Sequence, residues 1–352
     1  MKKVIFALAA VVALAACSNE EVIVADKGAA IGFDTFVENS TRATDPSLTV
    51  DKMKTTGFGV YGFVTNTVDE NDVTAPLFTN EKISWDAEAN NGAGAWTYDD
   101  KQYWMDGATY DFAAIAPYNA YRDVVAATTG VTLNFTNNGE TDLLYAQNNA
   151  VDGSAHSEVG FTFKHLLSKV KFTFTNNYDA TNTVIAVKNI VIDDAYAEGV
   201  ANLGRDANGV TATWAPSSDN LVLEFGDANP NAGYITQGAS QESDNALLLI
   251  PTASTEAAST YNVTFTIELL YHNGVDRYVK VQEYIHTVAL THKFEFGKSY
   301  NVATAINHTN IVPDDPNDPN DDNEQKSIEF TVTGITDWVD GGNAGVVFPE
   351  NN

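Results

Sequence analysis

The sequence is short of cysteine. Cys17 is the only cysteine among 352 residues, so no disulfide can form within the chain. The stability of the folded protein must therefore come from side-chain packing. A chain of this length is long enough to bury two sizeable apolar cores.

Basic residues are also scarce. The chain has 19 Lys and Arg against 47 Asp and Glu, which gives a formal net charge of −28. Proteins that bind nucleic acid need basic patches that displace counterions from phosphates. The charge balance excludes nucleic acid as a partner.

Long apolar runs are absent except near the N-terminus, where residues 4–14 follow Lys2 and Lys3. This run is too short for a transmembrane helix, and Leu-Ala-Ala then leads into Cys17, as in a secretory signal. The alternative is a plain signal peptide with an incidental cysteine. We expect residues 1–16 to be cleaved, Cys17 to carry palmitate-type acyl chains that anchor the protein in a membrane, and residues 17–30 to form the tether.

Catalytic and metal-binding motifs are missing as well. The six histidines show no HxH or HExxH spacing, and there is no G-x-S-x-G motif. The adjacent pair Asp99-Asp100 points to opposite faces of a strand, so it makes no acid–base couple. The run 314–324 offers oxygen ligands for Ca²⁺, but it lacks the glycine and final glutamate of an EF-hand loop. We therefore expect no enzyme activity, no metal and no cofactor.

Strand patterns dominate the rest of the chain. Residues 261–269 alternate strictly between apolar and polar side chains, and residues 170–174 do the same. This period of two predicts half-buried strands, whereas the continuous apolar run 247–250 predicts a central strand buried on both faces. Other expected strands are 58–64, 110–116, 131–135, 184–192 and 277–285. Many short strands with few helix signals indicate an all-β protein of antiparallel β-sandwiches.

The strands are too numerous for one sandwich, so we expect two domains. The predicted limits are 31–160 for the N-terminal domain and 161–312 for the C-terminal domain. Residues 313–325, rich in Pro, Asp and Asn, predict an extended linker that reaches about 40 Å. The C-terminal segment 326–352 follows, with Ile328, Phe330 and Val332 on one face of a strand.

Aromatic residues gather between positions 85 and 104. Trp85, Trp96 and Trp104 fall within twenty residues of each other. Exposed tryptophans stack on sugars, which would make this cluster a glycan-binding platform, whereas packing in a core explains most clusters of this kind. Burial of the rings distinguishes the two interpretations.

Several segments together resemble the fimbrillin-like pilin lipoproteins of Bacteroides and relatives. The acidic SNEE after Cys17 is similar to the surface-export tag of lipoproteins in that group. The other matching segments are GFGVYGF at 57–63, AWTYDDKQYWMDGATYDFAAIAPY at 95–118, TDLLYA at 141–146, FTFKHLLSKVKFTFTN at 161–176 and SIEFTVTGITDW at 327–338.

The resemblance implies two transthyretin-like β-sandwich domains and assembly of a pilus by strand exchange. An Arg-specific protease would cut after Arg42, which releases a first strand whose inner face is Ile31, Phe33, Thr35 and Val37. A C-terminal strand of another pilin subunit, with an apolar face like that of Ile328, Phe330 and Val332, would fill the groove. Residues 326–352 are then either a donor for a neighbour or an intrinsic strand, and Arg42 is either the processing site or an exposed loop residue, with other tryptic sites at Lys27, Lys52 and Lys54.

The sequence therefore predicts a structural subunit or accessory protein of an adhesive cell-surface pilus, exposed on the outer membrane before processing. The alternative is a glycan-binding surface lipoprotein that does not polymerise. A secreted hydrolase is disfavoured because the chain offers no catalytic group in a recognisable motif.

The lipid anchor gives a direct prediction. Replacing Cys17 with Ala removes the thiol that would carry the acyl chains, so the variant should remain as unlipidated precursor or soluble protein. Metabolic labelling with a palmitate analogue checks this, with the unchanged chain as control. Label on the Cys17→Ala variant would show that the protein is not a lipoprotein of this type.

Overall fold

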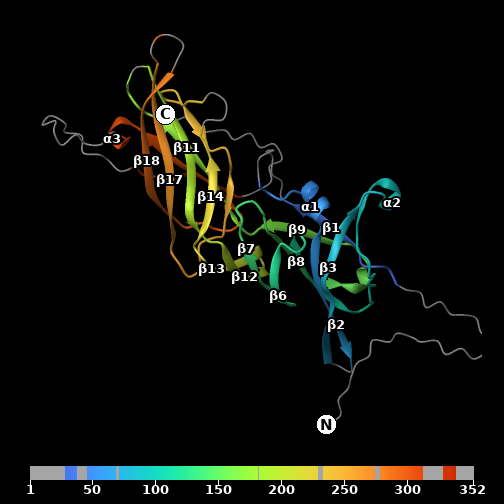
Figure 1. The fold of residues 1–352 in the computed structure, drawn as a ribbon. Coiled ribbons are helices and arrows are strands. Elements are labelled where there is room, and N and C mark those ends of the chain that lie inside the picture. Colours follow the sequence, from blue (N-terminus) through green and yellow to red (C-terminus); the bar gives the residue numbers. More distant parts are fainter. Residues whose placement is uncertain are drawn as a thin grey trace, which may run out of the picture.

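The computed structural model describes residues 28–37, 46–68, 71–180, 182–228, 233–272, 274, 278–311 and 328–337. These residues form twenty strands and few helical turns, so the predicted all-β class is confirmed. The molecule is elongated, with two stacked sheets at the C-terminal end, a seven-stranded sheet at the other end and a four-stranded sheet between them (Figure 1). In the described part of the chain, no helix combines the length and apolar character needed to cross a bilayer.

The N-terminal half is built on a seven-stranded sheet. In spatial order this sheet contains β1 (Phe33–Val37), β9 (Val159–His165), β8 (Leu144–Asp152), β5 (Thr109–Ala116), β2 (Phe58–Val68), β3 (Asn71–Asp86) and β4 (Ala95–Thr97). The turns α2 (Ala89–Gly92) and Gly153–Ala155 lie in its connections. Before β2, helix α1 (Val50–Thr56) starts where the Thr49 hydroxyl caps Lys52 N–H and ends at Gly57, which has a positive φ of 70°.

A four-stranded sheet covers the second face of this seven-stranded sheet. Its strands, in order, are β13 (Gly209–Ser217), β12 (Glu198–Asp206), β7 (Gly130–Thr136) and β6 (Tyr121–Ala127). Tyr61, Ile115 and Tyr145 from the large sheet pack in one buried cluster with Leu133 and Trp214 from the small one.

The C-terminal half is a sandwich of two further sheets. One contains β15 (Ser240–Glu242), β10 (Ser168–Asn176), β19 (Lys298–Ile306) and β20 (Thr331–Asp337), and β16 (Leu247–Leu249) also pairs with β10. The other contains β14 (Leu221–Gly226), β11 (Thr183–Ala195), β17 (Ser259–His272) and β18 (Tyr278–His292). Helix α3 (His308–Ile311) follows β19.

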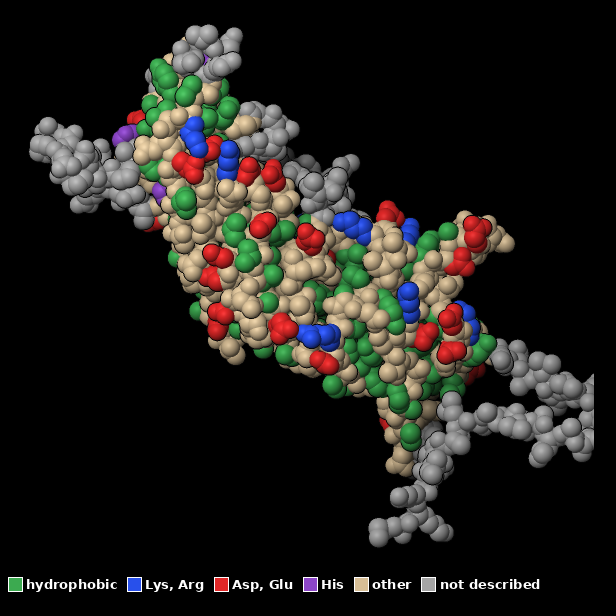
Figure 2. All heavy atoms as spheres, in the orientation of Figure 1, with side chains coloured by type: hydrophobic (Ala, Val, Ile, Leu, Met, Phe, Trp, Pro, Cys, Tyr) green, Lys and Arg blue, Asp and Glu red, His purple; other side chains and the backbone are tan. Residues whose placement is uncertain are grey.

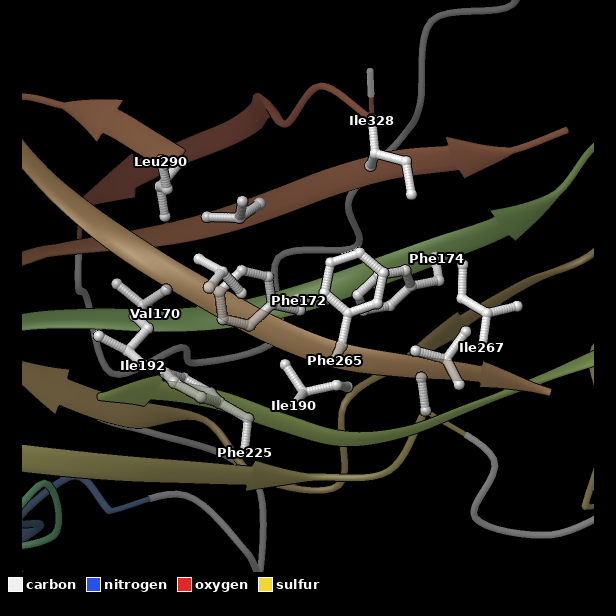
Figure 3. Packing of buried hydrophobic residues seen from close by; sticks show 14 of the residues in the cluster. Val170, Phe172, Phe174, Ile190, Ile192, Phe225, Phe265, Ile267, Leu290 and Ile328 are labelled. Carbon is white, nitrogen blue, oxygen red and sulfur yellow. The ribbon is translucent and has the colours of Figure 1, made fainter. Parts of the chain in front are cut away.

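Alternating side chains build the core of this sandwich. Along β10 and β17 every second residue is buried, as the period-two pattern predicted. Figure 3 shows Val170, Phe172 and Phe174 of β10 meeting Phe265 and Ile267 of β17.

One segment that follows the expected division at residue 160 pairs with strands of the N-terminal half. β12 and β13 come from residues 198–217, yet β12 pairs with β7 of the N-terminal half. The apolar second face of the seven-stranded sheet needs a cover, and this excursion of the chain supplies half of it. Residues 198–217 therefore pack with the N-terminal sheets instead of the C-terminal sandwich.

The expected antiparallel pairing also has exceptions. Most neighbouring strands run antiparallel, but β1 is parallel to β9 and β10 is parallel to β19. In addition, β16 is not a central strand, because in the described chain it pairs with β10 alone. It is buried on both faces because Leu247 and Leu249 enter one core while Leu248 and Ile250 enter the next.

A half-buried histidine makes the stability of the C-terminal sandwich depend on pH. Burial lowers the pKa of His286, whose ring stacks on Phe265 at 5.6 Å and whose Nε2 has no hydrogen-bond partner among the described residues. Because the pKa is lower in the folded state, the unfolded chain binds more protons below pH ~6.5. The free energy of unfolding should therefore fall as the pH drops from about 7.5 to about 5.5.

Urea unfolding at several pH values measures this slope. His286→Phe keeps the ring contact and removes the titrating group, so its slope should be smaller than that of the unchanged chain. His272→Gln, at the far end of the same hairpin, is the control. Equal slopes for His286→Phe and the unchanged chain would contradict the prediction.

Candidate functional site: two edge strands

The segment that contains β1 pairs with two other parts of the N-terminal half. β1 itself runs parallel to β9. The residues just before it pair with a different segment, because Ile31 N–H donates to the Gln102 carbonyl at 2.9 Å and Trp104 N–H donates to the Ala29 carbonyl at 3.0 Å. Residues 28–37 thus pair with the segment around residue 103 at their start and with β9 at their end.

The side chain of Phe33 fixes this strand in the core. Only 4% of Phe33 is exposed, and four aromatic rings surround it at centroid distances of 5.6 to 6.0 Å. Those rings belong to Phe78, Tyr98, Phe112 and Phe161. Ile31 and Thr35 are buried as well, as expected for the inner face, and the side chain of Val37 lies outside the described residues.

The chain is anchored again soon after β1. Leu48 N–H donates to Asp142 Oδ2 at 2.8 Å, and the Leu48 side chain is buried. The same carboxylate oxygen lies 2.7 Å from His165 Nδ1, and both side chains of this pair are almost fully buried. Arg42, the candidate processing site, and Cys17, the candidate lipidation site, both lie outside the described residues.

β20 forms an edge of the C-terminal sandwich. It is antiparallel to β19, and Thr304 Oγ1 donates to the Glu329 carbonyl at 2.8 Å just before the strand begins. Phe330 lies 5.5 Å from Phe172 and 5.8 Å from Phe265 between ring centroids. The regular strand starts at Thr331, a little later than the expected start at residue 327.

The predicted donor face is therefore packed in its own sandwich in this structure. Ile328 is 4% exposed and belongs to the same buried cluster as Phe174 and Ile267 (Figure 3). Phe330 and Val332 are partly buried against that cluster. These three side chains cover the edge that the sandwich would otherwise leave open.

The tryptophans proposed for glycan stacking contribute to the N-terminal core. Trp96 and Trp104 are 8% and 5% exposed, so their ring faces are not available to a sugar. Trp85 is partly exposed, but its ring packs edge-on against Trp96 at 5.3 Å and lies under Lys54 Nζ at 4.8 Å. The cluster is explained by packing.

A cavity that the sequence did not reveal lies at the end of β9. Its volume is about 640 Å³, and Lys164, Lys293 and Lys298 line it together with Trp214. Trp214 is buried and donates its Nε1–H to the Leu166 carbonyl at 3.0 Å. The β12–β13 excursion brings Trp214 here, which no local sequence pattern signals.

The described ranges of the chain hold no candidate metal centre. Within them, no group of three or more His, Cys, Asp or Glu side chains is arranged to hold a metal ion. The feature with the clearest functional geometry is thus the pair of edge strands β1 and β20.

The packing of β20 leads to a stability prediction. Replacing Phe330 with Ala should lower the free energy of unfolding by roughly 3 kcal/mol, the low end for a buried phenylalanine, because this ring is only partly buried. Glu329→Ala, on the exposed face next to it, is the control and should change little. Urea unfolding gives both values, and an unchanged midpoint for Phe330→Ala would mean that the strand is not held in its own sandwich in solution.

The comparison with known proteins agrees with this architecture. The fimbrillin-like family matches residues 41–338, and none of the curated proteins matches the chain. A fimbrial protein from Bacteroides vulgatus has a similar structure, with 17% identity, a TM-score of 0.60, and coverage of 88% of this chain and 99% of its own. A candidate cell adhesion protein from Bacteroides uniformis also matches, with 17% identity, a TM-score of 0.42, and coverage of 88% and 98%. The extent of the family match shows that this chain belongs to the fimbrillin-like family.

Proposed function

We propose that this protein is a structural or accessory subunit of an adhesive pilus, carried to the outer membrane as a lipoprotein and assembled by strand exchange after proteolysis. Membership of the fimbrillin-like family supports the pilus assignment. The observation that carries the mechanism is the burial of Phe33 among four rings on an edge strand.

Cleavage after Arg42 would convert β1 into a removable strand. Residues 28–37 and residues from 46 onward are held by separate contacts, since the second part is anchored through Leu48 and Asp142. One cut between them leaves β1 attached only by hydrogen bonds and by its buried side chains. The remaining body keeps its own anchor and its fold.

Loss of β1 would open a groove that only another strand fills well. The rings around Phe33 would be exposed, and the backbone groups of β9 that face β1 would lose their partners. Uncovering one phenylalanine site costs about 1.5–3 kcal/mol in burial alone. An incoming strand with apolar residues at every second position would cover the exposed rings and would pair with the free backbone groups of β9.

β20 of another subunit has the required pattern. Ile328, Phe330 and Val332 are spaced as Ile31, Phe33 and Thr35 are, and both strands occupy sheet edges. Transfer of β20 into a neighbour's groove exchanges one buried site for another, so the apolar area removed from water is largely conserved. Cleavage then determines which subunit accepts β20, because only a cut subunit has an empty groove.

Such a contact joins different surfaces of the two subunits. Heterologous contacts that do not close into a ring extend as a filament. In this proposal the partners are other pilin subunits, an Arg-specific protease and, through acylated Cys17, the outer membrane. No catalytic role is needed for the protein itself.

The experiment is to treat the full chain carrying Cys17→Ala with an Arg-specific protease and to look for filaments by electron microscopy. We expect cleavage after Arg42, filaments from the cut protein, and none from Arg42→Ala. The other arginines are Arg122, Arg205 and Arg277. Arg122, Arg205 and Arg277 are replaced by Lys in every sample, so that Arg42 is the only arginine that the protease can use.

Deleting residues 326–352 tests the donor. The truncated chain should be cut like the full chain but should fail to form filaments alone. Circular dichroism before protease treatment separates a missing donor from an unfolded protein. Filaments formed by the folded truncated chain, or by the Arg42→Ala chain, would refute the mechanism.

A further inference from the structure

β18 is an open sheet edge with an unusual share of exposed apolar side chains. It runs for fifteen residues at the end of the sheet β14-β11-β17-β18, and no strand in the described part of the chain pairs with its outer side. Its exposed large hydrophobic residues are Tyr278, Val279, Val281 and Ile285, and Ile285 is 71% exposed. An edge of this length and character normally pairs with another strand or is protected from doing so.

A bulge places the key side chains of β18 on one face. Lys280 pairs with Leu270 and Gln282 pairs with Leu269, so Val281 is the extra residue. Lys280 Nζ lies 2.6 Å from Glu283 Oε2 and 3.2 Å from Glu268 Oε1, which puts Lys280 and Glu283 on the same outer face.

Two apolar residues flank this ion pair on the outer face. Tyr278 packs against Tyr234 at a ring-centroid distance of 4.9 Å, and Ile285 lies two residues beyond Glu283. Along the outer face the order is therefore aromatic, basic, acidic and aliphatic, at positions 278, 280, 283 and 285.

The charges on this face balance, although the chain as a whole is strongly acidic. Lys188 lies 2.7 Å from Glu268, so two lysines and two glutamates form one neutral network. Figure 2 shows basic and acidic side chains together beside hydrophobic ones at this end of the molecule. Two copies of this surface can approach each other without the repulsion expected from a net charge of −28.

We propose that β18 is a self-association surface, on which β18 of a second copy of this chain pairs antiparallel to the first. The register that is centred between Val281 and Gln282 places Lys280 opposite Glu283 of the second copy, and it places Tyr278 opposite Ile285 of the second copy. Each contact occurs twice about the two-fold axis. The two four-stranded sheets become continuous, and cross-strand charge and apolar pairs stabilise the contact.

This contact is independent of strand exchange. Strand exchange involves β1 and β20 and does not involve β18, and β1 stays in place in the uncut chain. A pilin that polymerises through its ends would keep β18 free for side-to-side contact between subunits. Pairing through β18 can therefore occur without strand exchange, and strand exchange can occur without pairing through β18.

Sedimentation velocity of the uncut full chain carrying Cys17→Ala tests the pairing. We expect a concentration-dependent dimer. Lys280→Glu should lower the association constant about tenfold, because it creates two like-charge pairs across the axis. Adding Glu283→Lys to Lys280→Glu reverses the order of charges and should restore the dimer.

The apolar pair is tested with a matched control. Ile285→Lys should lower the association constant at least as much as Lys280→Glu does, because Lys replaces an aliphatic partner of Tyr278. Val222→Lys changes a residue that is 52% exposed on β14, the opposite edge of the same sheet, and should leave the dimer unchanged. A monomer at all concentrations, a dimer insensitive to Ile285→Lys, or a dimer lost in Val222→Lys would overturn the proposal.

Discussion

An edge strand with an apolar inner face must be covered by another strand, and much of this structure follows from that constraint. The N-terminal sheet is closed by residues 28–37, which pair on two sides and insert Phe33 among four rings. The C-terminal sandwich is closed by β20, which places Phe330 against Phe172 and Phe265. β1 is the first strand of the described chain and β20 is the last.

The two halves of the molecule are held together by shared strands. Leu247 and Leu249 face the C-terminal core, whereas Leu248 and Ile250 face the cluster under β12 and β13. The segment from β9 to β10 passes through all three clusters, with Phe163, Leu166 and Phe172 in successive cores. Separation of the halves would expose these residues to water, so a pulling force on one end is transmitted to the other through close packing.

Local patterns in the sequence predicted the strands and the side chains that face inward. Period-two alternation placed β10 and β17 well, because one face of each is buried and the other is wet or half-buried. The inner face of Ile31, Phe33 and Thr35 followed from the family resemblance, and these three side chains are buried. What local patterns could not give was pairing between distant segments, such as β12 with β7 or the parallel pair β10 and β19. Those pairings depend on which exposed apolar faces need cover once the sheets have formed, and this is a property of the assembled layers.

The same limit explains what was missed at the functional surfaces. The cavity is lined by residues that are far apart in the sequence. Lys164 and Lys298 are more than a hundred residues apart, and Trp214 comes from another sheet. On β18, residues 277–285 were predicted as a strand, but the bulge at Val281 that aligns Lys280 with Glu283 depends on the register with β17. Residues 247–250 were predicted as a central strand because a continuous apolar run indicates burial on both faces. The run does not tell whether neighbouring sheets or two separate cores bury those faces, and in this structure two cores do so.

The hydrogen bond from Leu48 to Asp142 has a practical consequence for redesign of the chain. On one side of residues 38–45 the chain is fixed by Phe33, and on the other side it is fixed by Leu48, in contacts that do not involve the residues between. If cleavage after Arg42 starts assembly, as proposed above, the sequence around Arg42 can be recoded for a different protease without a change to either anchor. A subunit altered in this way would fold as before and would become competent for assembly only when the chosen enzyme is supplied.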